Sequence, residues 1–149
     1  MSISDLRISK LRAYLVDVID DINSSFKQLN VNFLSNDVNN YSIDKIPTES
    51  ISERWINGIT INRDLYSFRS RMHYSADEIS NIENIGFYET FEKVIRLKNK
   101  DKELPDIQGI QAIRCLNCGS LVSADTNTAE FDIQIEIEYI ENDDELPSM

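Results

Sequence analysis

The amino-acid sequence predicts an α+β fold, in which an antiparallel or mixed β-sheet carries two main helices packed on one face. The first observation is the order of patterns along the chain, which runs helix, several strands, helix, several strands. Such an order is typical of domains whose helices gather on one side of an antiparallel sheet. The second is size, because 149 residues with a 41% hydrophobic share suit one domain with its own core. We expect that domain over residues 1–140, followed by an acidic, flexible tail over residues 141–149.

The N-terminal segment has the spacing of a long amphipathic helix. Its apolar residues recur every three or four positions and form one stripe: Leu11, Leu15, Val18, Ile22, Phe26 and Leu29. This period is typical of a helix that buries one face, and neither Pro nor Gly interrupts it. We therefore expect a helix that begins at a Ser2 or Ser4 cap and continues to about Leu29.

Strands follow this helix, with segments 31–34, 41–46 and 50–56 as candidates. Asn57-Gly58 then predicts a two-residue hairpin turn, because both central residues of that turn need positive φ. The chain alternates again after the turn. Ile59 and Ile61 share one face, and Tyr66 and Phe68 share a face further on, so we expect a break or bulge near residues 62–64.

The second half repeats the order of helix and strands. A helix is predicted from a cap at Ser80 or Asn81 to a point before Leu104-Pro105, and a strand over residues 108–117. The stretch 120–128 is polar and rich in turn residues, so we expect a loop there and another at residues 36–47, both candidates to become ordered on assembly. The clearest strand runs from Ala129 to Ile140. Its apolar residues alternate with acidic or polar ones, which predicts one core face and one wet, acidic face.

The charge balance disfavours two classes of partner. The chain has 15 Lys and Arg against 26 Asp and Glu, a formal net charge of −11. Binding to nucleic acid phosphates or to an anionic membrane needs clustered basic residues. Arg114 is the last basic residue, and nothing after it in the chain offsets the acidic ones. The N-terminus has no apolar signal core and no apolar run approaches the ~20 residues that span a bilayer, so we expect a soluble intracellular protein.

Motifs for catalysis or metal binding are weak. Cys115 and Cys118 have a metal-like spacing, but a structural zinc site wants four ligands and the sequence has no second pair. We interpret them as reduced cysteines near a turn. His73 is the only histidine, and it lies in a strand pattern without a nucleophile signature. We expect no catalytic site, no metal and no cofactor.

Several short motifs in order resemble a known family. They are Trp55-Ile56-Asn57-Gly58, the aromatic and Arg-rich stretch 66–71, Leu104-Pro105, Asp125-Thr126 and the alternating strand 131–139. Together they cover most of the chain, and its order of elements is similar to that of the tail-terminator (tail-completion) proteins of long-tailed bacteriophages.

The resemblance implies a homohexameric ring that caps the tail tube, stops its polymerisation and offers a docking face to the head–tail connector. Tube protein, connector and, where a tail has one, sheath protein would be its partners, while DNA passes through without specific binding. The protein would be located in the neck of the virion, which is assembled in the bacterial cytoplasm. We expect two sets of contact residues. The first would face the lumen or a neighbouring subunit: Asp132, Glu136, Glu138, Arg69 and Arg71. The second is the hairpin: Trp55, Asn57 and Gly58.

Two other readings remain open from the sequence. One is another head–tail joining protein, such as a stopper or adaptor. The other is a small monomeric module that binds a ligand or peptide, which would need a concave apolar pocket with a few convergent polar groups.

Overall fold

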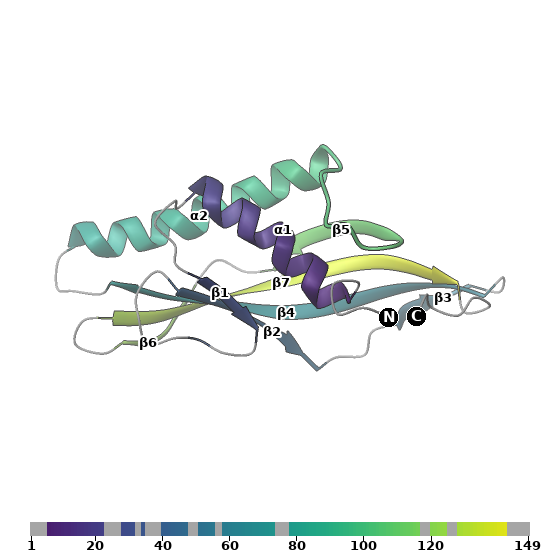
Figure 1. Cartoon of the computed structure of the whole chain (residues 1–149), viewed down its shortest axis with the longest axis horizontal. Helices are drawn as coiled ribbons and strands as arrows, with labels where there is room; N and C mark the ends of the chain where they lie inside the picture. The colour runs from purple at the N-terminus through teal and green to yellow at the C-terminus, as the bar shows by residue number, and fades with distance from the viewer. Residues whose placement is uncertain are drawn as a thin grey trace.

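The computed structural model describes residues 6–22, 28–31, 34, 40–47, 51–55, 58–73, 78–116, 120–124 and 128–142. Within these ranges, helices α1 (Arg7–Ile22) and α2 (Glu78–Lys100) pack on one face of a single seven-stranded sheet (Figure 1). The strands are β1 (Gln28–Val31), β2 (Asn40–Ile46), β3 (Ile51–Arg54), β4 (Ile59–His73), β5 (Ile110–Cys115), β6 (Ser120–Ala124) and β7 (Thr128–Asn142). The predicted α+β fold with two helices on one face is confirmed.

Two long strands form the centre of the sheet. β4 and β7 pair antiparallel over their whole length in one unbroken register, from Ile59↔Asn142 to His73↔Thr128. β2 and β3 pair with the other edge of β4, and β5 and β6 pair with the other edge of β7. β1 extends the sheet beyond β2, to which it is parallel, so the sheet is mixed as predicted.

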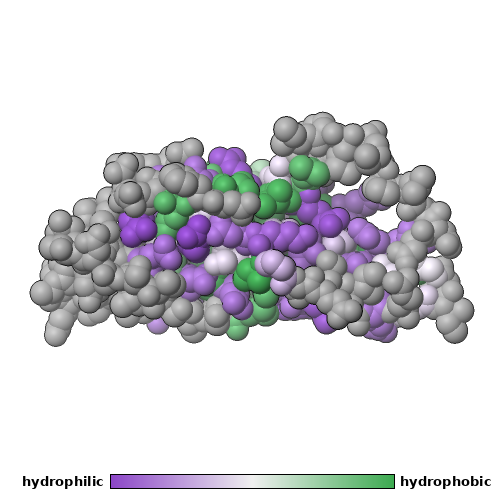
Figure 2. Space-filling view, turned by 90° about the horizontal axis from the view of Figure 1, so that it is seen from below, coloured by the Kyte–Doolittle hydropathy of each residue, from purple (hydrophilic) through white to green (hydrophobic). Residues whose placement is uncertain are grey.

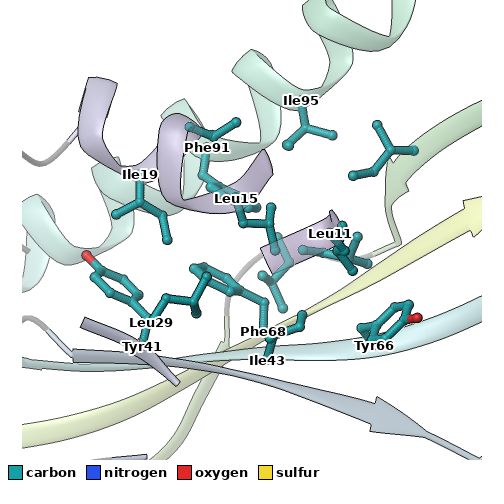
Figure 3. Close-up of a cluster of buried hydrophobic side chains, with 14 of the residues drawn as sticks. Leu11, Leu15, Ile19, Leu29, Tyr41, Ile43, Tyr66, Phe68, Phe91 and Ile95 are labelled. Atoms are coloured by element: carbon teal, nitrogen blue, oxygen red, sulfur yellow. The ribbon is translucent and has the colours of Figure 1, made fainter. Parts of the chain in front are cut away.

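The core lies between this sheet and the helices. Alternate residues of β7 point toward the helices and are buried: Phe131, Ile133, Ile135, Ile137 and Tyr139. Phe68 of β4 lies at the centre, where its ring stacks on Tyr41 at 5.5 Å and on Phe91 of α2 at 4.8 Å between centroids. Figure 3 shows Tyr41 and Phe68 beneath Leu11, Leu15 and Ile19 of α1. Stacked aromatic rings add to the stability that burial alone provides.

The predicted end of the first helix is wrong. α1 ends at Ile22, and Leu29 lies in β1. Leu29 is nevertheless buried in the same core as Leu15, with 1% of its surface exposed. The apolar spacing therefore predicted correctly that Leu29 is buried, but the chain brings it to the core from a strand. Phe26, the other late member of the stripe, lies outside the described residues.

The predicted bulge in β4 is also wrong. The β4–β7 register continues unbroken through residues 62–64, and the only shift on this side lies in β3, between Ile51 and Glu53. As a result Thr60 and Asn62 point into the interior, while Ile59 and Ile61 point to the other face. The buried pair is tolerated because Asn62 Nδ2 donates a hydrogen bond of 2.9 Å to Thr60 Oγ1.

The β3–β4 hairpin is confirmed, but its turn differs from the prediction. Trp55 N donates to Ile59 O at 2.8 Å, and Gly58 N donates to Trp55 O at 3.2 Å. Gly58 therefore closes the turn and does not lie at its centre. Its φ of 85° is the left-handed conformation that ends a three-residue hairpin loop, which glycine adopts without strain. Asn57 lies outside the described residues.

Other predicted helix and strand boundaries also differ from those in the structure. α2 begins at Glu78, before the predicted cap, because packing of Phe87 and Phe91 outweighs the ~1 kcal/mol that Gly86 costs a helix. Residues 120–124 form strand β6, where a loop was predicted, whereas the strand predicted over residues 41–46 is confirmed as β2. β7 continues to Asn142, so the first two residues of the predicted tail belong to the sheet.

Helix side chains cover backbone groups at both edges of the sheet. Arg12 Nε of α1 donates to Leu29 O of β1 at 2.9 Å. Asn99 Oδ1 of α2 accepts from Ile113 N of β5 at 3.0 Å. Uncovered strand edges are templates for pairing with another chain, so these two contacts block strand addition where they occur.

Replacing the central ring tests this description of the core. We expect Phe68→Ala to lower the free energy of unfolding by about 3–5 kcal/mol, because it removes a buried ring and leaves a cavity. Urea denaturation followed by circular dichroism measures this. Leu97→Ala, at a residue that is 48% exposed, is the control and should change stability by less than about 0.5 kcal/mol. Equal effects of the two variants would contradict the assigned core.

Candidate assembly surface

The sequence-predicted contact residues lie together on the sheet face that α1 and α2 leave uncovered. In a strand, alternate side chains share a face. On this face, residues of β4 lie opposite residues of β7 in the strand register, as in Arg63↔Glu138, Arg69↔Asp132 and Arg71↔Glu130. Figure 2 views this side and shows hydrophilic residues in a band across the middle of the molecule. We call it the open face, defined by Asp44, Arg63, Ser67, Arg69, Arg71, Arg114, Glu130, Asp132, Gln134, Glu136 and Glu138.

Two arginines hold the carboxylates of Glu136 and Glu138 from both sides. Arg63 of β4 places Nη2 3.0 Å from Glu138 Oε1 and Nε 3.8 Å from Glu136 Oε1. Arg114 of β5 places Nη1 3.0 Å from Glu136 Oε1 and Nη2 3.2 Å from Glu138 Oε2. The two glutamate side chains are only 20% and 16% exposed. This partly shielded, branched network holds its charges in place better than an isolated surface pair does.

A second network occupies the other half of the open face. Arg69 Nε lies 2.6 Å from Asp44 Oδ2 of β2, and its Nη1 lies 3.7 Å from Glu130 Oε1. Arg71 Nη2 approaches the same Glu130 oxygen at 3.6 Å. Asp132 accepts a hydrogen bond of 2.6 Å from Ser67 Oγ. All five predicted contact residues therefore belong to one continuous polar surface.

The prediction of an uncompensated acidic face is wrong. Among the described residues, the arginines of β4 and β5 pair with Asp44, Glu130, Glu136 and Glu138, whereas Asp132 accepts from Ser67. Four arginines against five carboxylates leave a formal charge of −1 on the open face. The roles of Arg114 and Asp44 were not foreseen from the sequence, because they depend on strand pairing. The sequence carried one signal: Arg63, Arg69 and Arg71 alternate along one strand as the acidic residues do along another.

The hairpin adds an apolar end to the open face. Trp55 is 42% exposed and lies directly across from Ile59, and Ile61 pairs with Ile140 on the same side. Trp55 Nε1 donates a hydrogen bond of 2.7 Å to Glu53 Oε1. We call Glu53, Trp55, Gly58, Ile59 and Ile61 the hairpin tip. Two of the three predicted hairpin residues, Trp55 and Gly58, thus lie at one end of the surface.

A buried polar cluster on the opposite side of the sheet was not foreseen from the sequence. The Asp64 side chain is fully buried, and its Oδ2 accepts from Arg7 Nε of α1 at 3.0 Å. Its Oδ1 accepts from Tyr139 OH of β7 at 3.1 Å. Burial raises the pKa of Tyr139, an effect that Arg7 opposes and Asp64 reinforces, so this hydroxyl keeps its proton for the bond. Both carboxylate oxygens are thus engaged, which suits an anchor for α1 better than a reacting group.

The described residues contain no group of three or more His, Cys, Asp and Glu side chains placed to hold a metal ion. None of the helices in this part of the chain is long and apolar enough to span a membrane. Cys115 is half-buried at the end of β5, whereas Cys118 and the His73 side chain lie outside the described parts.

Comparison with known proteins yields no relative: no protein-family model matches the chain, and no curated protein matches its sequence. A proposal about function therefore depends on the geometry of the open face and on the resemblance in the order of motifs.

A double-mutant cycle tests the open-face network. Arg63→Ala and Glu138→Ala should show a coupling of about 0.5–1 kcal/mol in unfolding free energy, because the two side chains pair directly. The coupling should shrink in 1 M salt, where the screening length is about 3 Å. The control pair is Lys10 and Asp106, at 3.3 Å with Asp106 95% exposed, which should show almost none. Equal coupling in both pairs would contradict the network.

The buried cluster predicts a second set of stability changes. Asp64→Asn should lower the unfolding free energy by about 1.5–3 kcal/mol, because it removes the anion that Arg7 binds. Tyr139→Phe should cost about 1 kcal/mol through the loss of one hydrogen bond. Asp106→Asn, at an exposed carboxylate, is the control. Thermal and urea unfolding measure all three, and a neutral Asp64→Asn variant would show that the cluster does not anchor α1.

Proposed function

We propose that this protein is a structural, ring-forming component of the tail-terminator type, which caps a tail tube and offers a docking face to the head–tail connector. The observation that carries the proposal is the open face, a broad polar surface on which four arginines pair with four of the five carboxylates and hold them in place. The order of motifs from Trp55 to Tyr139 supports the choice of this family of assemblies. In this proposal the chain binds proteins and catalyses no reaction.

The chemistry of the open face suits contact with another protein. Arginine and tryptophan are enriched at protein interfaces, and here four arginines lie on the open face and the exposed Trp55 lies at one end of it. Charges that are fixed before binding select the orientation of a partner more than they add affinity. A docking ring needs this property, because it must meet one end of a tube in one orientation.

The charge balance also bears on which of two expected roles the open face has. An acidic lumen that repels DNA needs unpaired carboxylates, whereas Glu136 and Glu138 are each paired with two arginines. A face with almost no net charge exerts little repulsion on DNA. We therefore favour contact between the open face and a protein of the assembly, either the tube protein or the connector.

The oligomeric state of the full-length chain tests the proposal. We expect native mass spectrometry and negative-stain images to reveal rings of about six copies, either alone or after addition of tubes reassembled from the tube protein of the same genome. Arg63→Ala, on the open face, should weaken binding to tube ends, whereas Lys10→Ala, on the helix side, should not. Thermal unfolding of both variants controls for loss of fold. A chain that stays monomeric and ignores tube ends would overturn the proposal and direct the search to small ligands.

A further inference from the structure

A hollow lies at the edge of the sheet opposite to the hairpin tip. It has a volume of about 210 Å³ and opens between α2 and β5. Ile95, Ile113 and Cys115 provide its apolar lining, and Arg96, Arg114 and Glu92 its charged part. β5 pairs with the outer edge of β7, and β3 pairs with the outer edge of β4. The tip and the hollow are therefore on opposite sides of the central strand pair.

The hollow suits an aromatic side chain. A cavity of about 150 Å³ in another protein takes up benzene, so the space here is adequate for a large part of an indole ring. Arg96 and Arg114 at its border can lie against an aromatic face, which attracts cations. The hairpin tip presents such a group, because Trp55 is 42% exposed.

The charges of the two surfaces are complementary. Arg96 is exposed, and no ion pair joins it to any residue in the described ranges. Glu53 is also exposed, and its one described contact is the hydrogen bond of 2.7 Å from Trp55 Nε1. Arg114 is already paired with Glu136 and Glu138, so Arg96 is the cation of the hollow that remains for a partner. A tip that carries a tryptophan with an adjacent carboxylate thus matches a hollow with an apolar lining and an arginine that no described residue pairs with.

Trp55 cannot reach the hollow of its own chain. Trp55 lies across from Ile59, which pairs with Asn142, whereas Cys115 pairs with Ile135. Seven residues of β7 separate these two levels, about 23 Å at ~3.3 Å per residue. Three strand spacings, from β3 across β4 and β7 to β5, add about 14 Å sideways at ~4.8 Å each. Only a second copy of the chain can bring a tip to this hollow.

We propose that the hairpin tip of one copy inserts Trp55 into the hollow between α2 and β5 of the next copy, with Glu53 facing Arg96. The inference rests on the proposed function, because a ring is built from contacts between two different patches repeated head to tail. It specifies which two surfaces of neighbouring subunits meet at this joint, which the proposed function leaves open. The proposed contact is also compatible with the hydrogen bond from Ile113 N to Asn99 Oδ1 at the edge of β5. The contact inserts a side chain and does not add a strand to β5, so this bond can remain.

The natural tryptophan reports on this joint without any substitution. Trp55 is the only tryptophan of the chain. On assembly of the full-length protein, its fluorescence emission should shift to shorter wavelength and its quenching by acrylamide should fall, because the ring leaves water. Rings whose Trp55 emission and quenching match those of the monomer would overturn the joint while leaving the proposed function intact.

A cross-link locates the contact. In a Cys115→Ser, Cys118→Ser background, Trp55→Cys combined with Arg96→Cys should give a ladder of disulfide-linked oligomers on a non-reducing gel after mild oxidation. A disulfide needs Cα atoms within about 7 Å, so it cannot form inside one chain. Leu97→Cys in place of Arg96→Cys is the matched control, because Leu97 is exposed on the same helix but does not line the hollow. Each single variant should remain without a ladder.

The outcomes separate the two proposals. A ladder with Arg96→Cys that is absent with Leu97→Cys supports the joint. Dimers from Trp55→Cys alone would mean that two tips meet symmetrically, which overturns it, as would rings in native mass spectra without any ladder. A monomer in every condition, with no binding to tube ends, overturns the proposed function and the joint together.

Discussion

The register between β4 and β7 is the constraint on which the rest of the structure depends. The two strands pair over 15 residues each without a shift, and four of the other five described strands attach directly to them. A slip of one residue would turn every side chain of one strand to the other face. Phe68 would then leave the core and Arg69 would enter it. Burial of the aromatic stack and pairing of the open-face charges therefore select the same register, and each stabilises the other.

The same constraint explains the buried polar cluster. Because β4 has no bulge, its first half must turn Thr60, Asn62 and Asp64 toward the helices. Buried polar groups are stable only when they are hydrogen-bonded, and a buried charge needs a partner. Arg7 supplies that partner from the first turn of α1, and Tyr139 supplies a second bond from β7. An irregular sequence in one strand thus determines where the N-terminal helix is attached.

The sequence predicted those features that depend on local periodicity. The alternation from Phe131 to Tyr139 predicted β7 and its buried face, and the helical stripes predicted α1, α2 and the α+β fold. What it missed depends on contacts between distant segments. Leu29 kept a helical spacing although it lies in a strand, and Glu138 looked uncompensated because Arg63 lies 75 positions earlier in the chain. β6 was missed because it is only five residues long and forms a strand by pairing with β7. Residue type and spacing identified five members of the candidate surface, but only strand pairing reveals the others and the charge balance.

The contacts at the two sheet edges have a consequence for the storage of the protein in solution. When copies of a chain are stored at high concentration, they can pair with one another through uncovered strand edges. Arg12 and Asn99 occupy backbone groups of β1 and β5 that would otherwise nucleate fibres between stored copies. Arg12 and Asn99 belong to α1 and α2, so the two strand edges stay covered only while both helices are packed on the sheet. If heat or a mutation detaches a helix, the strand edge that it covers becomes exposed. Stored protein would therefore aggregate sooner, well before the sheet itself unfolds.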